Sequence, residues 1–145
     1  MKRIFGNFLL ILATVPFLCG TDCSNWANAE WVMYVENHSD KTVYFIVGFD
    51  VVPGSGYYPT TELPNDSTRL RSVGVNQRIP ISYASFRDVK AKPDDLIAVF
   101  VLDPDTVRKY TWDQLREDEN WLKRYIFTRT ELGAHAAPSN PLIYP

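Results

Sequence analysis

The chain has 145 residues, a formal net charge of -2, 46% hydrophobic and 14% aromatic residues. This composition is typical of a globular chain, and the length fits one domain. The slightly acidic balance disfavours a nucleic acid or an anionic membrane surface as the main partner, because both require a concentrated basic face.

The N-terminus has the pattern of an export signal. Two basic residues follow Met1, and the apolar run Ile4–Leu18 (IFGNFLLILATVPFL) is too short to span a bilayer with those flanks. We predict a signal peptide over residues 1–18 and a lipidated tether or extended linker over residues 19–29. A single β-sandwich domain over residues 30–145 would follow.

The two cysteines, Cys19 and Cys23, lie directly after the apolar run. A disulfide framework inside the domain is therefore excluded. We predict that Cys19, or alternatively Cys23, is the lipidated first residue of a bacterial lipoprotein, anchored in the cell envelope at the outer membrane. Two alternatives stay open: a small Cys19–Cys23 disulfide loop, and cleavage after Ala29 to give a soluble periplasmic or secreted protein.

The first predicted strands are Glu30–Glu36 and Lys41–Asp50, and the turn residues Asn37–Asp40 between them predict a hairpin. Lys41–Asp50 (KTVYFIVGFD) is apolar on both faces, because successive side chains of a strand point to opposite sides. It should therefore be a central strand that is covered on both faces.

The middle of the chain is rich in proline and glycine. Val51–Asp66 (VVPGSGYYPTTELPND) predicts a long loop, with at most a short edge segment. Short strands are expected over Thr68–Val75 and Gln77–Tyr83, and Pro80 should confine the latter to a sheet edge or a bulge.

The second central strand is Asp94–Asp103 (DDLIAVFVLD), again apolar on both faces. After it, Asp105 can cap a short turn. Thr111 with Gln114, and Thr128 with Glu131, have the spacing of capping boxes and predict two short helices. A strand over Leu122–Phe127 and a closing strand over Leu142–Tyr144 complete the prediction.

These elements predict a mainly β fold, an antiparallel sandwich with short helices in the C-terminal third. No helical period of useful length lies between Asp50 and Asp94, which disfavours a parallel sheet of strand-helix-strand units. A sheet whose central strands are apolar on both sides needs a further layer on each face. We expect the helices to cover one face and the other strands to cover the second.

Three stretches carry a resemblance: NHSDKTVYFIVGF (37–49), YYPTTELP (57–64) and DPDTVRKYTWDQLREDENWLKRYIFTRTEL (103–132), followed by IYP (143–145). Together they resemble an uncharacterised family of exported, lipoprotein-like domains from gut Gram-negative bacteria. The resemblance implies an immunoglobulin-like β-sandwich and a location in the cell envelope. It implies no known activity and no catalytic residues.

The chain offers few candidates for chemistry. His38 lies in a predicted turn and His135 in an alanine-rich tail, and the local sequence orients neither toward a nucleophile. We expect no catalytic site, no cofactor and no metal. Tyr57 and Tyr58, flanked by glycine and proline in the long loop, are the candidate ligand contacts. Trp112, Trp121 and Tyr125 are expected to pack in the core.

The function expected from these observations is a non-catalytic binding or interaction module of the envelope. Its partner would be an envelope protein or a glycan, and a lipid anchor would hold it to the membrane. The alternative is a structural accessory lipoprotein, held in an envelope assembly through a sheet edge; a free edge strand and an apolar patch would favour it. A hydrolase is the least favoured class, because no convergent set of polar groups is visible.

Overall fold

The computed structural model describes residues 30–85 and 90–145. The predicted signal peptide (1–18), the tether (19–29) and both cysteines lie outside these residues. The strands are β1 (Glu30–Asn37), β2 (Val43–Val47), β3 (Phe49–Val52), β4 (Gly56–Pro59), β5 (Arg71–Val73), β6 (Arg78–Ser85), β7 (Leu96–Leu102), β8 (Lys123–Thr128) and β9 (Leu142–Tyr144). The helices are α1 (Pro104–Lys109), α2 (Trp112–Glu117) and α3 (Arg129–Gly133), with the 3₁₀ turns η2 (Ser67–Arg69) and η3 (Ala134–Ala136).

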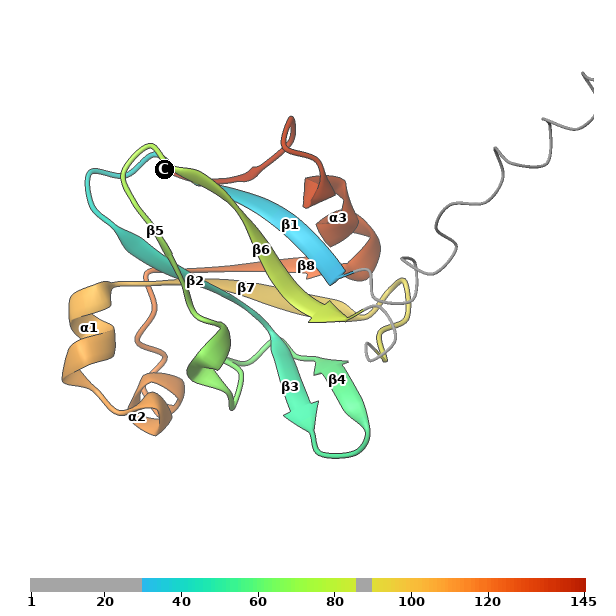
Figure 1. Cartoon of the computed structure of the whole chain (residues 1–145). Helices are drawn as coiled ribbons and strands as arrows, with labels where there is room; N and C mark the ends of the chain where they lie inside the picture. The colour runs from blue at the N-terminus through green and yellow to red at the C-terminus, as the bar shows by residue number, and fades with distance from the viewer. Residues whose placement is uncertain (1–29, 86–89) are drawn as a thin grey trace, which may run out of the picture.

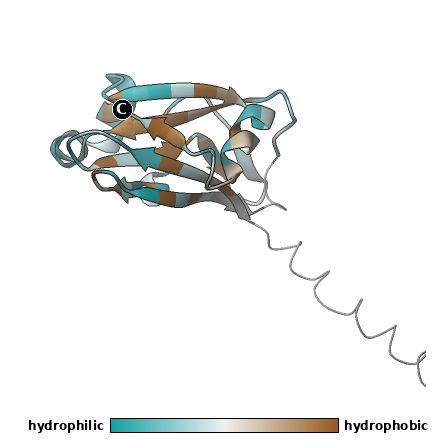
Figure 2. Ribbon diagram, turned by 90° about the horizontal axis from the view of Figure 1, so that it is seen from above, coloured by the Kyte–Doolittle hydropathy of each residue, from teal (hydrophilic) through white to brown (hydrophobic). Residues whose placement is uncertain are grey.

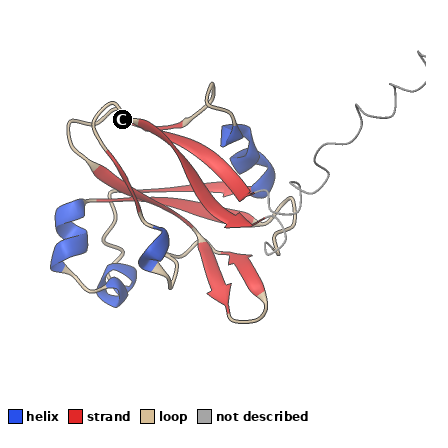
Figure 3. Cartoon of the chain, viewed as in Figure 1, coloured by secondary structure: helices blue, strands red, loops and turns tan. Residues whose placement is uncertain are grey.

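The described chain is mainly β, as predicted, and its strands form three sheets (Figures 1 and 3). One has four strands in the order β5-β2-β7-β8, and all its neighbours are antiparallel. The second has the order β6-β1-β9, in which β1 pairs antiparallel with β6 and parallel with β9. The third is the separate hairpin β3–β4.

The predicted hairpin between the first two strands is wrong. β1 pairs with β6 and β9, whereas β2 pairs with β5 and β7, so the chain changes sheets between them. The reason lies in Asn37, which is fully buried and donates from Nδ2 to the carbonyl oxygens of Lys41, Val73 and Gly74. Its Oδ1 accepts from the backbone N–H and the hydroxyl of Ser39. These bonds turn the chain into the second sheet rather than back along the first.

The main core lies between the two larger sheets. It takes the inner face of β2 and β7, as the alternation predicted, together with residues of β1, β5, β6, β9 and α3. The buried members are Met33, Val35, Val43, Phe45, Val47, Phe49, Val73, Ile81, Ala91, Ile97, Val99, Val101, Leu132 and Leu142. Figure 2 shows apolar residues in brown along the strands.

A second core covers the opposite face of the four-stranded sheet. Ile46 of β2 and Ala98, Phe100 and Leu102 of β7 pack there against Leu63 and against Leu115 of α2. Figure 1 shows α1 and α2 beside this sheet, on the side away from β1 and β6. The expectation that helices cover one face and strands the other is therefore confirmed for α1 and α2, whereas α3 packs with the strands in the main core.

The predicted strand Lys41–Asp50 is divided at Gly48 into β2 and β3. The N–H of Gly48 still donates to Ala98 O at 2.7 Å, but its carbonyl accepts from Thr60 N at 2.9 Å. Thr60 O in turn accepts from Ala98 N at 3.0 Å. The segment after β4 thus enters the ladder between β2 and β7, and β3 leaves the sheet.

The helix signals of the C-terminal third are confirmed with one correction. Both capping boxes are present, Thr111 with Gln114 at α2 and Thr128 with Glu131 at α3. The cap of α1, however, is Asp103, whose side chain accepts from the Asp105 N–H. Proline at position 104 explains the shift, because it fits the first turn of a helix and makes the residue before it the cap.

The middle strands are shorter or displaced relative to the prediction. The predicted strand Thr68–Val75 contains the last two residues of η2 and then only the three residues of β5. Pro80 lies on β6 at an edge of the three-stranded sheet, as predicted. The predicted loop Val51–Asp66 contains the end of β3 and all of β4, so a hairpin that sequence reasoning did not expect projects there.

Candidate functional site

The hairpin β3–β4 is closed by the turn Val52–Gly56. The Ser55 N–H donates to Val52 O at 2.9 Å, and Gly54 adopts a φ of +75°, a conformation that favours glycine. Figure 1 shows the hairpin extending away from both larger sheets. Its root is fixed by the Gly48–Thr60–Ala98 bonds, so the hairpin presents its side chains from a fixed base.

The two predicted contact tyrosines lie on opposite faces of this hairpin. Tyr57 pairs with Val51 and packs, partly buried, against the main core. Tyr58 pairs with Asp50 on the other face and is 39% exposed. The structure therefore does not bring the two rings together; Tyr58 is open to a partner, and Tyr57 supports the hairpin.

Tyr57 is held by a cation. The guanidinium carbon of Arg69, in η2, lies 4.0 Å from the centre of the Tyr57 ring. Such contacts stabilise by about 0.5–1 kcal/mol at exposed sites and more when desolvated. The Arg69 charge also helps to lower the pKa of Asp66, after the larger contribution from the hydrogen bonds of Thr68 to that carboxylate. This contact joins the hairpin to η2.

The outward face of the hairpin combines apolar and acidic chemistry. Because side chains alternate, Asp50 and Val52 share the face of Tyr58. Val52 is 43% exposed, and Asp50 Oδ1 accepts from the Asn65 N–H at 2.9 Å. Sequence reasoning missed Asp50 and Val52 as members of the face. The alternation around the Pro-Gly-Ser-Gly turn could have identified them.

A cleft of about 480 Å³ adjoins the same hairpin. It is lined by residues 51–57 and by Lys90, whose N–H donates to Tyr57 O at 2.9 Å. The lysine is exposed, so the cleft has a cation on one side and the aliphatic and glycine residues of the turn on the other. An uncharged or anionic group with an apolar face fits this lining better than a cation does.

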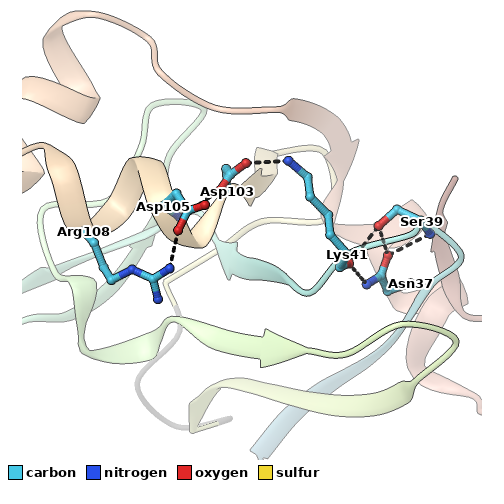
Figure 4. A network of polar contacts seen from close by, with 6 residues as sticks. All are labelled: Asn37, Ser39, Lys41, Asp103, Asp105 and Arg108. Atoms are coloured by element: carbon cyan, nitrogen blue, oxygen red, sulfur yellow. Dashed lines mark hydrogen bonds and ion pairs between the residues drawn. The ribbon is translucent and has the colours of Figure 1, made fainter.

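Charged groups elsewhere form a network that serves the fold (Figure 4). Lys41 Nζ lies 2.5 Å from Asp103 Oδ2, and Asp105 pairs with Arg108 on α1. The hydrogen bond from Lys41 is the main cause that lowers the pKa of Asp103, and the same bond raises the pKa of Lys41. The backbone carbonyl of Lys41 accepts from Asn37 Nδ2. The network therefore ties the start of β2 to the end of β7 and leaves its cations paired.

The two histidines contact side chains of the fold. His38 Nε2 contacts Glu36 Oε1 at 2.9 Å, and His135 packs edge-on against Phe127. In residues 30–85 and 90–145, no group of three metal-ligating side chains comes together.

The aromatic residues expected in the core are found there. Trp112 and Trp121 pack against the second core, and Tyr125 packs against the main core. The Trp112 indole N–H donates to Pro64 O, and the Tyr125 hydroxyl donates to Ile143 O.

No protein-family model, no curated protein and no solved structure matches this chain. Within the part of the chain that the structure describes, no helix has the length and apolar character needed to cross a membrane.

Proposed function

We propose that the chain is an exported, non-catalytic binding module of the bacterial cell envelope that presents the β3–β4 hairpin to its partner. The observation that carries the proposal is the outward hairpin face of Asp50, Val52 and Tyr58, with two exposed apolar side chains on a fixed root. An exposed tyrosine suits binding contacts, because its ring packs on apolar surface while its hydroxyl group hydrogen-bonds to polar groups or water.

The chemistry of this face favours a glycan over a purely apolar ligand. The Tyr58 ring can cover the apolar face of a sugar, and the carboxylate oxygens of Asp50 can accept hydroxyl hydrogen bonds. One carboxylate oxygen of Asp50 already accepts the Asn65 N–H, which fixes the side chain. A protein loop with hydroxyl-bearing residues is the other partner class that this face suits.

Binding to the hairpin can be tested with soluble oligosaccharides released from lipopolysaccharide and from peptidoglycan. Wild type should bind at least one of them, and Tyr58→Ala should weaken it about tenfold, since the aromatic contact is lost. Val75→Ala is the matched control, because Val75 is 48% exposed outside the hairpin. Equal affinities for wild type and Tyr58→Ala would contradict a role for this face.

Export and lipidation are part of the same proposal. They are supported by the basic start, the apolar run Ile4–Leu18 and the cysteines that follow it. Labelling with an alkyne fatty acid in the native host should mark wild type, and Cys19→Ala, or alternatively Cys23→Ala, should remove the label and release the protein from the membrane. A wild type without label would leave a soluble exported protein.

We further propose that the fold is an immunoglobulin-like sandwich. The support is the division of strands: β1 pairs with β6 in one sheet, and β2, β7 and β8 are neighbours in the other. This division corresponds to the B–E and C–F–G pairs of immunoglobulin sandwiches. The parallel strand β9 and the β3–β4 hairpin are additions to that plan. Backbone amide contacts between neighbouring strands, measured by NMR, would test the correspondence strand by strand.

A second candidate function is that of a structural accessory in an envelope assembly. One observation favours it: β8 is an edge strand and carries the exposed apolar side chain of Ile126. Native gel electrophoresis of detergent-extracted membranes would test it, since a structural accessory should migrate well above its own mass.

A further inference from the structure

The four edge strands of the two larger sheets differ in how they are protected against pairing with another chain. β5 has only three residues, and short edge strands resist such pairing. On β9, the Ile143 carbonyl accepts from the Tyr125 hydroxyl. On β6, Pro80 lies opposite Tyr34. The Asn37 N–H donates to Gln77 O, and bonded and non-bonded pairs alternate along an antiparallel ladder, so Tyr34 and Pro80 form a pair without mutual hydrogen bonds. The missing N–H of Pro80 therefore faces outward.

β8 has six residues and no proline. The Arg129 N–H donates to Asp95 O. Because hydrogen-bonded and non-bonded pairs alternate along an antiparallel ladder, Tyr125 and Phe127 are residues of β8 whose backbone groups bond to β7. Arg124 and Ile126 consequently direct their N–H and C=O groups away from β7. In the described residues, no side chain bonds these groups, whereas the outward N–H of Thr128 is taken by Glu131 Oε2.

The side chains beside this edge form a small apolar surface. Ile126 is 47% exposed and Leu96, on β7, is 52% exposed. Leu96 pairs with Thr128 and Ile126 with Ala98, so the two side chains are diagonal neighbours on the outer face. Arg124 shares that face, with its guanidinium carbon 5.6 Å from the Trp121 ring.

The charge of β8 selects the occupant. The strand carries Lys123 and Arg124 and no acidic residue. Antiparallel pairing of two copies of β8 would place four cations along one ribbon without a carboxylate, which disfavours a second copy. Arg124 and Ile126 lie two residues apart on the same face, so an antiparallel segment with an apolar residue two positions before an acidic one would place the apolar side chain opposite Ile126, near Leu96, and the carboxylate opposite Arg124.

We propose that the free edge of β8 is a strand-addition site, which takes an extended acidic–apolar segment of a partner protein through the backbone of Arg124 and Ile126. This inference rests on the second proposed function and names its surface. Main-chain hydrogen bonds supply affinity there, and Arg124 supplies the preference for an acidic segment.

The test uses a fluorescein-labelled threonine peptide that carries one valine and one glutamate two positions apart, in the order Val-Thr-Glu, and the same peptide with lysine in place of glutamate. Wild type should bind the glutamate peptide saturably, with amide chemical-shift changes at Arg124 and Ile126. Ile126→Pro should weaken binding about tenfold, because it removes an outward N–H and leaves the β7 ladder intact. Ser72→Pro, at an outward N–H of β5, is the matched control and should bind like wild type.

Arg124→Glu provides a second, independent variant. It should reverse the preference, so that the lysine peptide binds more tightly than the glutamate peptide. A wild type that binds neither peptide at the β8 amides overturns the proposal, as does an Arg124→Glu variant with unchanged preference. If Ile126→Pro fails to fold, the charge reversal decides alone. If the native gel shows an assembly but the peptides do not bind, the second proposed function stands and β8 is not its surface. If the protein migrates as a monomer but binds the glutamate peptide, β8 is a strand-addition site and the second proposed function is wrong.

Discussion

The carbonyl oxygen of Thr60 lies in the space that a Cβ on Gly48 would occupy. The same two residues share a hydrogen bond, from Thr60 N to Gly48 O at 2.9 Å. This close approach lets the hairpin leave the four-stranded sheet without an open ladder, because Thr60 fills the position between β2 and β7 at Ala98.

Gly48→Ala should therefore destabilise the protein by about 3 kcal/mol, since the backbone of two paired segments must separate. The measurement is the free energy of unfolding in urea. Gly133→Ala is the control: its φ of -61° is helical and nothing lies within 4 Å of an added Cβ. That variant should be unchanged or slightly more stable. A similar effect at both glycines would mean that the contact does not constrain the chain.

Removal of the Asn37 side chain should be equally costly. Asn37→Ala leaves three carbonyl oxygens without their donor at a fully buried position, and we expect a loss of about 3 kcal/mol in urea unfolding. Asn65→Ala should change stability by less than about 0.5 kcal/mol, since that side chain is exposed. A mild effect of Asn37→Ala would show that water replaces its bonds.

Acid should weaken the Lys41–Asp103 pair. The pKa of Asp103 is below its ordinary value of 3.8 in the folded protein. The pair therefore contributes its full stability at pH values above the ordinary pKa of Asp103. That stability is lost as the pH falls through the lowered pKa of the folded protein. Asp103→Asn removes the charge but keeps an oxygen that can cap α1.

Thermal unfolding at about pH 7 and about pH 2.5 should thus show a larger acid loss of stability for wild type than for Asp103→Asn. Identical acid losses in the two proteins would assign the pH dependence to other carboxyls, such as Glu36 and Glu131, whose pKa values are also lowered.

The helical layer should contribute to global stability. Leu115→Ala empties a fully buried position between α2 and the sheet, which should cost about 3 kcal/mol. Leu122→Ala, at a side chain that is 40% exposed, should cost less than about 1 kcal/mol. The free energy of unfolding of both variants is measured in guanidinium chloride. Equal losses in the two variants would contradict the assignment of α2 as a core layer.

The sequence predicted the parts of the fold that local rules control. Alternation in β2 and β7 identified both cores, and the spacing of Thr111–Gln114 and Thr128–Glu131 identified two helix starts. These features depend on neighbours within four residues or on a period of two, which a sequence shows directly.

Strand partners could not be predicted in the same way. The turn residues after β1 are compatible with a hairpin, but buried Asn37 bonds to Val73 and Gly74, far along the chain, and β2 lies in another sheet. Likewise, Tyr57 and Tyr58 were indistinguishable in the sequence. The ring of Tyr57 faces Arg69, and that pairing depends on the position of η2.

The parallel pairing of β1 with β9 has a consequence for biogenesis. Asn37 is in register with Tyr144, and the His38 N–H donates to Tyr144 O at 2.7 Å, so one sheet joins the first and last strands of the described chain. A growing chain lacks this strand until residue 144 has been synthesised. The three-stranded sheet is therefore completed only after synthesis reaches that point, and until then the edge of β1 that β9 covers is open.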